Sequence, residues 1–325
     1  MVALSRRGVL AGGVMLAGCA SVGSRGGYST LYYLGQAQVL RVAASGGEAR
    51  VLVDATAENA TARGVNDGIA LDLPRGHVYW TNMGRAAERD GYVMRCDLDG
   101  ANVKTIVAPG ATFTPKQLKI DHSAGRGAGK LYWSDREGMA IERCNLDGSQ
   151  LETLLVTGDP AANKGDETRW CVGMAVDAER GHIYWSQKGG DNAGAGVIRR
   201  MRLETPAGMS AGNRTDVETL FAGLPEPIDL DLDLATRTLY WTDRGDNTIS
   251  RAPMDPKPGF DPAKRTDRKV LVSGLNEAIG VALDLAGGRM AYTSLGGELG
   301  VAKLDGSDAR MIGSHKGLLT GVAWG

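Results

Sequence analysis

The sequence is poor in the residues that most often carry chemistry. Its 325 residues include only four cysteines and four histidines, and the formal net charge is −1. For the chain as a whole, this near-neutral charge argues against the strongly basic class of proteins that bind nucleic acids. No CxxC pair or Cys/His cluster occurs, so we do not expect a zinc site.

The histidines do not indicate a hydrolase of the Ser–His or Cys–His type. His77 and His182 each stand in an Arg-Gly-His turn, and the other two also lie in turns or loops. None of them falls beside a serine or cysteine with the surroundings of a nucleophile. The sequence therefore offers no catalytic triad.

The N-terminal residues predict export and a lipid anchor. Ser5-Arg6-Arg7-Gly8-Val9-Leu10 resembles a twin-arginine export signal, and the apolar run after it is too short to span a bilayer. The run ends at Leu16-Ala17-Gly18-Cys19, which resembles a bacterial lipobox. We expect removal of residues 1–18, lipidation of Cys19 and a flexible tether at 19–27. The alternative is an ordinary signal peptide with a chance cysteine.

On this interpretation, we expect the protein to be located in the cell envelope. Ala20 is not the aspartate that would hold such a lipoprotein at an inner membrane. In a cell with two membranes, we therefore expect the exported protein at the periplasmic face of the outer membrane.

One repeated stretch dominates the rest of the chain. Four close copies stand at Val78-Tyr79-Trp80-Thr81-Asn82, Leu131-Tyr132-Trp133-Ser134-Asp135, Ile183-Tyr184-Trp185-Ser186-Gln187 and Leu239-Tyr240-Trp241-Thr242-Asp243. Weaker copies stand at Leu31-Tyr32-Tyr33-Leu34 and Met290-Ala291-Tyr292-Thr293-Ser294. A period of roughly 50 residues, rich in short strands, is typical of propeller blades.

Each repeat contains further strand signals. An apolar alternation ending in Asp precedes the motif, as in Gly173-Met174-Ala175-Val176-Asp177. After the motif come a polar loop, a strand with a basic residue, an Asp-Gly turn and a last short strand. This pattern predicts a four-stranded antiparallel meander, A to D, with the Tyr-Trp motif on strand B. Cys96 and Cys144 fall at similar places in neighbouring repeats, too far apart for a disulfide.

The repeats resemble the YWTD β-propellers, the class B repeats of low-density-lipoprotein receptors. The resemblance covers residues 28–325 and implies an all-β, six-bladed propeller of four-stranded blades. The first repeat lacks strand A, and the chain ends in Leu319-Thr320-Gly321-Val322-Ala323-Trp324, which has strand A character. We therefore expect the C-terminal strand to complete the N-terminal blade and close the ring.

The motif itself is interpreted as structural. Its Tyr and Trp recur around the ring, whereas a residue needed once for chemistry need not be repeated, so we expect them to fill the seams between blades. The resemblance implies that the motif Asp bonds within and between blades. Only Asp135 and Asp243 keep it here, so we expect looser seams.

A ligand site is expected at the axial end where strand A begins, since long loops gather there. The candidates are polar, charged or aromatic residues at the start of strand A, after the motif or in a loop: Asn66, Asp67, Lys116, Gln117, Trp170, Asp229, Asp243 and Arg244. Their mixed charge suits a protein, peptide or glycan ligand. The alternative is a solvated, charged mouth that binds nothing.

A second resemblance concerns the same residues. Asn66-Asp67-Gly68 is similar to the Asn-Asp-Gly of the gluconolactonase (SMP-30) propellers, whose Asn and Asp imply a divalent metal site. Asp243 falls where a metal-binding Asp of that family lies. The glutamate that those enzymes use on their first inner strand is missing here, because Leu318-Leu319-Thr320-Gly321 contains no acid.

Three functional hypotheses follow. The first is a non-enzymatic, lipid-anchored binding propeller, monomeric and without a cofactor. The second is a metal-dependent, lactonase-like hydrolase that would use Asn66, Asp67, Asp229 and Asp243 with a cation such as calcium. The third is a purely structural envelope protein.

Overall fold

The structure is a computed structural model that describes residues 27–55 and 64–325. The expected signal at 1–18, the lipidation site Cys19 and nearly all of the tether lie outside the described residues. So does part of the long loop between residues 54 and 67. No helix in the described part of the chain is long and apolar enough to cross a membrane.

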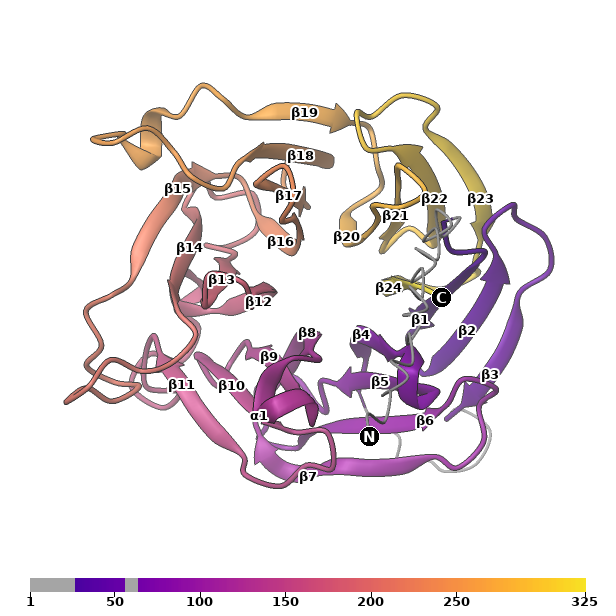
Figure 1. Cartoon of the computed structure of the whole chain (residues 1–325), viewed down its shortest axis with the longest axis horizontal. Helices are drawn as coiled ribbons and strands as arrows, with labels where there is room; N and C mark the ends of the chain where they lie inside the picture. Colours follow the sequence, from indigo (N-terminus) through magenta and orange to yellow (C-terminus); the bar gives the residue numbers. More distant parts are fainter. Residues whose placement is uncertain (1–26, 56–63) are drawn as a thin grey trace, which may run out of the picture.

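Six four-stranded antiparallel sheets form a ring, which confirms the predicted six-bladed propeller (Figure 1). From the innermost strand outward, the first three blades are β24 (Leu319–Trp324), β1 (Thr30–Gly35), β2 (Gln38–Ala43), β3 (Arg50–Asp54); β4 (Asn66–Asp72), β5 (His77–Asn82), β6 (Gly91–Asp97), β7 (Lys104–Thr112); and β8 (Pro115–Asp121), β9 (Lys130–Asp135), β10 (Ala140–Asn145), β11 (Glu152–Val156).

The last three blades are built in the same way. Their strands are β12 (Cys171–Asp177), β13 (His182–Gln187), β14 (Gly196–Arg202), β15 (Glu218–Leu224); β16 (Pro227–Asp233), β17 (Thr238–Asp243), β18 (Thr248–Pro253), β19 (Lys269–Val272); and β20 (Ala278–Asp284), β21 (Arg289–Ser294), β22 (Glu298–Lys303), β23 (Arg310–Ser314). Short helical turns lie between strands: η1 (Leu73–Arg75), α1 (Ala124–Gly127), η2 (Glu167–Arg169) and η3 (Pro262–Lys264).

The C-terminal strand closes the ring as predicted. β24 pairs antiparallel with β1, with Leu31 opposite Trp324, so the yellow C-terminal strand lies beside the indigo β1 (Figure 1). The backbone N–H of Thr30 donates to the carbonyl of Gly325 at 2.8 Å. The first blade is therefore assembled from both ends of the described chain and leaves no free inner edge.

The motif aromatics fill the seams, as predicted. Successive side chains of strand B point to opposite faces of the sheet, so the tyrosine packs toward the next blade and the tryptophan toward the previous one. Tyr79 of blade 2 packs in one cluster with Trp133 of blade 3, and Tyr132 with Trp185 one seam further on. The Tyr79 hydroxyl also donates to the carbonyl of Leu146 in blade 3, at 3.2 Å.

The threonine or serine of the motif forms a second, polar link across each seam. Thr242 accepts a hydrogen bond from the backbone N–H of Asp229 in its own blade, at 3.0 Å, and donates to the carbonyl of Ile279 in the next blade, at 2.6 Å. Equivalent hydroxyls donate to the next inner strand from Thr81, Ser134, Ser186 and Thr293. Where the first blade has Leu34 instead, Thr320 donates to the carbonyl of Asn66, at 2.8 Å.

The last residue of the motif mainly holds loops. Asp243 accepts from the backbone N–H groups of Glu226, at 2.9 Å, and Gly245, at 3.0 Å. The hydroxyl bridges persist where the Asp is replaced, as at Thr81-Asn82 and Ser186-Gln187. Loss of the motif Asp therefore does not remove the polar link across a seam, and the expected loosening does not follow from it.

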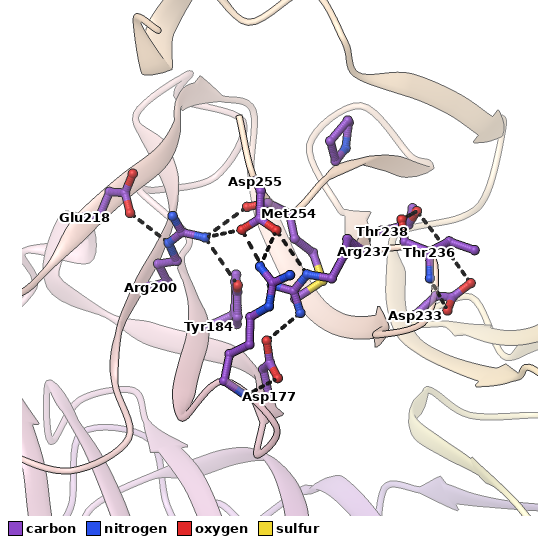
Figure 2. Close-up of polar contacts among 12 residues, drawn as sticks. Asp177, Tyr184, Arg200, Glu218, Asp233, Thr236, Arg237, Thr238, Met254 and Asp255 are labelled. Atoms are coloured by element: carbon purple, nitrogen blue, oxygen red, sulfur yellow. Dashed lines mark hydrogen bonds and ion pairs between the residues drawn. The ribbon is translucent and has the colours of Figure 1, made fainter. Parts of the chain in front are cut away.

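An arginine-rich contact joins blades 4 and 5 at the axial end where the inner strands finish (Figure 2). Asp255, just after β18, accepts hydrogen bonds from Arg200 at 2.8 Å and Arg237 at 3.0 Å, and it also pairs with Arg180. Burial alone would raise the pKa of Asp255, but the hydrogen bonds from Arg237 and Arg200 lower it to about 2. The start of the long connection between β18 and β19 is thereby fixed against blade 4.

The three cysteines in the described residues are unpaired and buried, as expected. Burial raises the pKa of the thiols of Cys96, Cys144 and Cys171 to about 12. They remain protonated near neutral pH and act as small apolar residues.

The hydroxyl bridges generate a stability prediction. Thr242→Val keeps the side-chain shape but leaves the buried N–H of Asp229 and carbonyl of Ile279 without this partner. We expect a loss of about 1–3 kcal/mol in the free energy of unfolding, measured by denaturant titration. Thr153→Val, at an exposed position in β11, is the control and should change stability by less than about 0.5 kcal/mol. Equal small effects for both variants would contradict the bridge.

Candidate functional site

Four of the predicted site residues lie together where the inner strands of blades 2 and 3 begin. Lys116 and Asp67 form a buried ion pair, and Gln117 donates to Asp67 Oδ1 at 3.1 Å. Burial lowers the pKa of Lys116, while Asp67 opposes that shift. Asn66 accepts from the Asn82 amide at 2.9 Å. These side chains therefore satisfy one another's hydrogen bonds and form a polar wall of fixed geometry.

Asp229 belongs to a separate group in blade 5. Its carboxylate accepts from the backbone N–H of Leu230, at 2.8 Å, and of Val281 in the next blade, at 3.0 Å. Burial raises the pKa of Asp229 to about 6, and Lys119 acts against that rise. Asp231 bonds to blade 6 in the same manner, through the N–H of Leu283 at 2.9 Å. Both acids thus join blades 5 and 6.

Asp243 is more deeply buried than the sequence predicts for a ligand-binding residue. It has no exposed surface, and its second carboxylate oxygen has no partner among the described residues. Burial and the nearby Asp246 raise the pKa of Asp243 to about 6. The Asp243 oxygen that accepts from the N–H of Glu226 holds the loop at that residue. The carboxylate is therefore not exposed at the mouth of the ring.

A charged network links Arg244 to Trp170. Arg244 donates to Glu226 at 3.1 Å and to Asp191 at 2.7 Å, and Lys188 pairs with both of these acids. Lys188 Nζ lies 5.5 Å from the centre of the Trp170 ring. The sequence reasoning selected neither Glu226 nor Asp191; for Glu226, the available signal was its position directly before Pro227, the first residue of β16.

Trp170 faces a cavity of about 360 Å³ formed by loops of blades 2, 3 and 4. The wall is mainly apolar, with charged groups at Arg136, Glu137 and Lys164. The residues that line the cavity are Ala86, Ala87, Phe113, Arg136, Glu137, Met139, Pro160, Lys164, Gly165 and Trp170. The Arg136 guanidinium lies 4.9 Å from the Trp170 ring centre and is held by Glu137. Trp170 Nε1 is buried and has no hydrogen-bond partner.

The sequence predicted Trp170 but not the cavity in front of it. Phe113, Met139 and Pro160 come from three loops that share no motif, so no pattern in the sequence connects them. The cavity has the apolar lining and few polar groups that are typical of ligand sites. Such a site fits an apolar group that packs beside the Trp170 ring.

The carboxylates near the mouth do not assemble a metal centre. Among residues 27–55 and 64–325, no three His, Cys, Asp or Glu side chains are grouped so that they could hold a metal ion. Asp67 is paired with Lys116, while Asp229 and Asp243 accept from backbone N–H groups. A calcium ion would need six or more oxygen ligands, and these side chains supply carboxylates one at a time.

A buried acid pair lies behind this face. The Thr112 hydroxyl is 2.7 Å from both Asp135 Oδ2 and Glu142 Oε2. A hydroxyl has one hydrogen, so the second short contact requires a proton on one of the acids. Asp135 accepts from the N–H groups of Phe113, Thr114 and Gly138, whereas Glu142 Oε2 accepts from Trp133 Nε1 at 2.8 Å. The acid with fewer donors, Glu142, is therefore the better place for the proton. Burial, with Asp135 nearby, raises the pKa of Glu142 to about 7.

Comparison with known proteins gives two extended sequence relatives, while no protein-family profile matches the chain. The chain is 41% identical over 290 residues to low-density lipoprotein receptor-related protein 1 of Pyricularia oryzae, covering 86% of this chain and 89% of that one. It is 38% identical over 268 residues to 3-hydroxyacyl-CoA dehydrogenase-like protein LAM1 of Cochliobolus heterostrophus. That match covers 79% of this chain but only 55% of the relative, so the chain spans about half of that protein.

Solved structures share the fold at lower identity. A chain in a nidogen/laminin complex has a TM-score of 0.65 at 22% identity and covers 90% of this chain and 97% of its own. A gluconolactonase from Xanthomonas campestris has a TM-score of 0.56 at 20% identity, over 80% and 79% of the two chains. Regucalcin from Agrobacterium tumefaciens has the same TM-score at 19% identity, over 81% and 79%.

The acid pair predicts a pH-dependent stability. Between the ordinary glutamate pKa and about 7, folded Glu142 holds a proton that the unfolded chain has released, so this stabilising contribution is lost as pH rises through about 7. Glu142→Gln is neutral at every pH. From pH 5 to pH 8 we expect wild type to lose roughly 1–3 kcal/mol relative to this variant in denaturant titrations.

The control for this measurement is Glu179→Gln, at an exposed turn position. Acids remote from Glu142 titrate equally in wild type and both variants, so the difference between proteins reports on the Glu142–Asp135 pair. Parallel pH profiles for wild type and Glu142→Gln would contradict the assignment of the proton.

Proposed function

The chain belongs to the YWTD β-propeller family, and on that premise we propose that it is a non-enzymatic binding propeller. Its ligand is a protein, peptide or glycan, held at the loop-rich axial face. The observation that carries this proposal is the cavity at Trp170, an apolar pocket with an unpaired buried donor. Rigid aromatic anchors in such pockets contribute most of the binding energy at many interfaces.

The charges around the mouth support binding more than catalysis. Lys116, Lys188 and Arg244 are each paired with an acid, so they form a fixed pattern of charge. Such a pattern orients a ligand and selects against wrong partners. The cysteines of the described chain are protonated and buried, so they lack the thiolate that a nucleophile needs.

A metal-dependent lactonase is the second candidate. The fold likeness to a gluconolactonase and to regucalcin favours it. Asn66, Asp67, Asp229 and Asp243 would be its ligands, with calcium as the cation. Their present bonds to Lys116 and to backbone N–H groups would have to change first.

The expected location completes the proposal. A twin-arginine signal and a lipidated Cys19 would export the propeller and hold it at the periplasmic face of an outer membrane. The lipid would keep the monomeric propeller at the envelope, so that its ligand is a component of that compartment.

The binding proposal predicts which variants lose the ligand. Peptides selected from a random phage-displayed library on the purified full chain, and glycans from an array, should bind through the Trp170 cavity. Trp170→Ala and Met139→Ala should each weaken binding by about tenfold or more in calorimetry, because both remove walls of the cavity. Leu285→Ala, an exposed apolar residue in a turn at the opposite axial end, should have no effect.

Two results would contradict this proposal. Selected ligands that are insensitive to Trp170→Ala but lost with Leu285→Ala would move the site to the other face. Stabilisation of wild type by calcium, magnesium, manganese or zinc that disappears in Asp67→Asn would instead support the metal-dependent hydrolase.

The anchor proposal has its own test in cells. Cys19→Ser removes the thiol that would carry the lipid, so the protein should move from the membrane fraction to the soluble fraction after lysis. Ser21→Ala is the control and should leave the distribution unchanged. Unchanged membrane association of the Cys19→Ser protein would refute lipidation at this residue.

A further inference from the structure

Two successive arginines of β14 have very different surroundings. Arg200 has two acidic partners: it donates to Glu218 at 2.7 Å and to Asp255 at 2.8 Å, and Figure 2 shows both contacts. Arg199 points to the other face of the sheet, toward blade 3. Within the described residues, 27–55 and 64–325, it makes no ion pair or hydrogen bond, and its Nε is buried without a partner.

Arg199 is partly buried, and of its guanidinium nitrogens only Nε is both buried and without a partner. Burial lowers the pKa of Arg199, because the charged form loses hydration, and Cys171 is the one group that acts in the opposite direction. The Cys171 thiol is itself protonated near neutral pH, since burial raises its pKa to about 12. It therefore supplies no neutralising charge. Buried cations are normally paired, so this arginine lacks a counter-charge.

Arg199 lines a cavity of about 440 Å³ in the seam between blades 3 and 4. Two more arginines reach this cavity, but both are neutralised: Arg169 by Asp166 and Arg214 by Asp216. None of the twelve lining residues is an acid: Leu155, Val156, Thr157, Thr168, Arg169, Trp185, Gln187, Ala195, Val197, Arg199, Arg214 and Val217. The cavity thus carries one uncompensated positive charge in a mainly polar lining, with a smaller apolar part.

We propose that this cavity is a binding site for a small organic oxyanion, a carboxylic acid or phosphate ester whose charged group pairs with Arg199. A planar guanidinium binds both kinds of group through two parallel hydrogen bonds. The volume is within the range of small-molecule sites and exceeds the needs of an inorganic ion. Ala195, Val197 and Val217 would contact the apolar part of the ligand.

The site is separate from the cavity at Trp170 and does not depend on the proposed function. Thr168 and Arg169 line the anion cavity, whereas Trp170, the next residue, lines the other one. The short segment around η2 therefore divides two cavities of different chemistry. A ligand in one need not touch the other.

Benzoate and phenyl phosphate test the proposal, because each joins an oxyanion to an apolar ring. In thermal shift measurements on the full chain, at constant ionic strength set with sodium chloride, at least one should raise the Tm of wild type by about 2 °C or more. Benzyl alcohol has the ring but no charge and should not raise it. A response to benzoate alone assigns a carboxylate ligand, and to phenyl phosphate alone a phosphate ester.

Arg199→Gln is the decisive variant. Without ligand it should melt at or above the temperature of wild type, since it removes a partly buried charge without a partner. It should lose the oxyanion response, with affinity in calorimetry reduced by about tenfold or more. Arg95→Gln is the matched control: its Nε is also buried without a partner, but Arg95 lies beside Tyr79 and lines neither this cavity nor the Trp170 cavity.

Three outcomes would overturn the proposal. They are no Tm response of wild type to either oxyanion, an equal response of wild type and Arg199→Gln, and an equal response to benzyl alcohol and benzoate. A response lost in Arg95→Gln as well would reduce the effect to general surface charge and would also overturn it.

Discussion

The hydroxyl group of the motif threonine or serine is the interaction on which the ring depends. One hydroxyl has a hydrogen and two lone pairs, so it can satisfy an N–H of its own blade and a carbonyl of the next. This requires the inner strands of neighbouring blades to lie close together. The glycines of those strands allow it: a Cβ at Gly173 would lie only 1.8 Å from the carbonyl oxygen of Ile228. The motif hydroxyl and the inner-strand glycine are therefore two parts of one constraint.

Where the inner-strand glycine is replaced, the mouth of the ring becomes polar. Gln117 and Asp229 stand at this position in blades 3 and 5, and each uses its side chain to bond to the inner strand of an adjoining blade. Charges that look like a ligand site in the sequence are thus partly links between blades. The residues left for ligand recognition are those that no contact between blades requires. Trp170 is the clearest example.

The sequence contained most of the fold because the fold is repetitive. The period of the Tyr-Trp motif predicted the blades, and the lone strand at Leu319–Trp324 predicted the closure. The hydroxyl bridge was not predictable, because it depends on a register shift in the inner strand that frees the N–H of a residue such as Asp229. The two cavities were hidden for a related reason: their walls come from loops with different sequences, and the lack of a partner for Arg199 becomes evident only in three dimensions.

The segment between β11 and β12 is where the chain departs most usefully from its repeat. A propeller holds its blades rigidly, so a loop inserted at one seam can present side chains in fixed positions without weakening the other five. Here that loop turns through η2 and places Arg169 and Trp170 on opposite sides. An apolar cavity selects for shape, whereas a cavity with one unpaired cation selects for charge. A single short loop can therefore give an otherwise symmetric ring two kinds of selectivity at one seam.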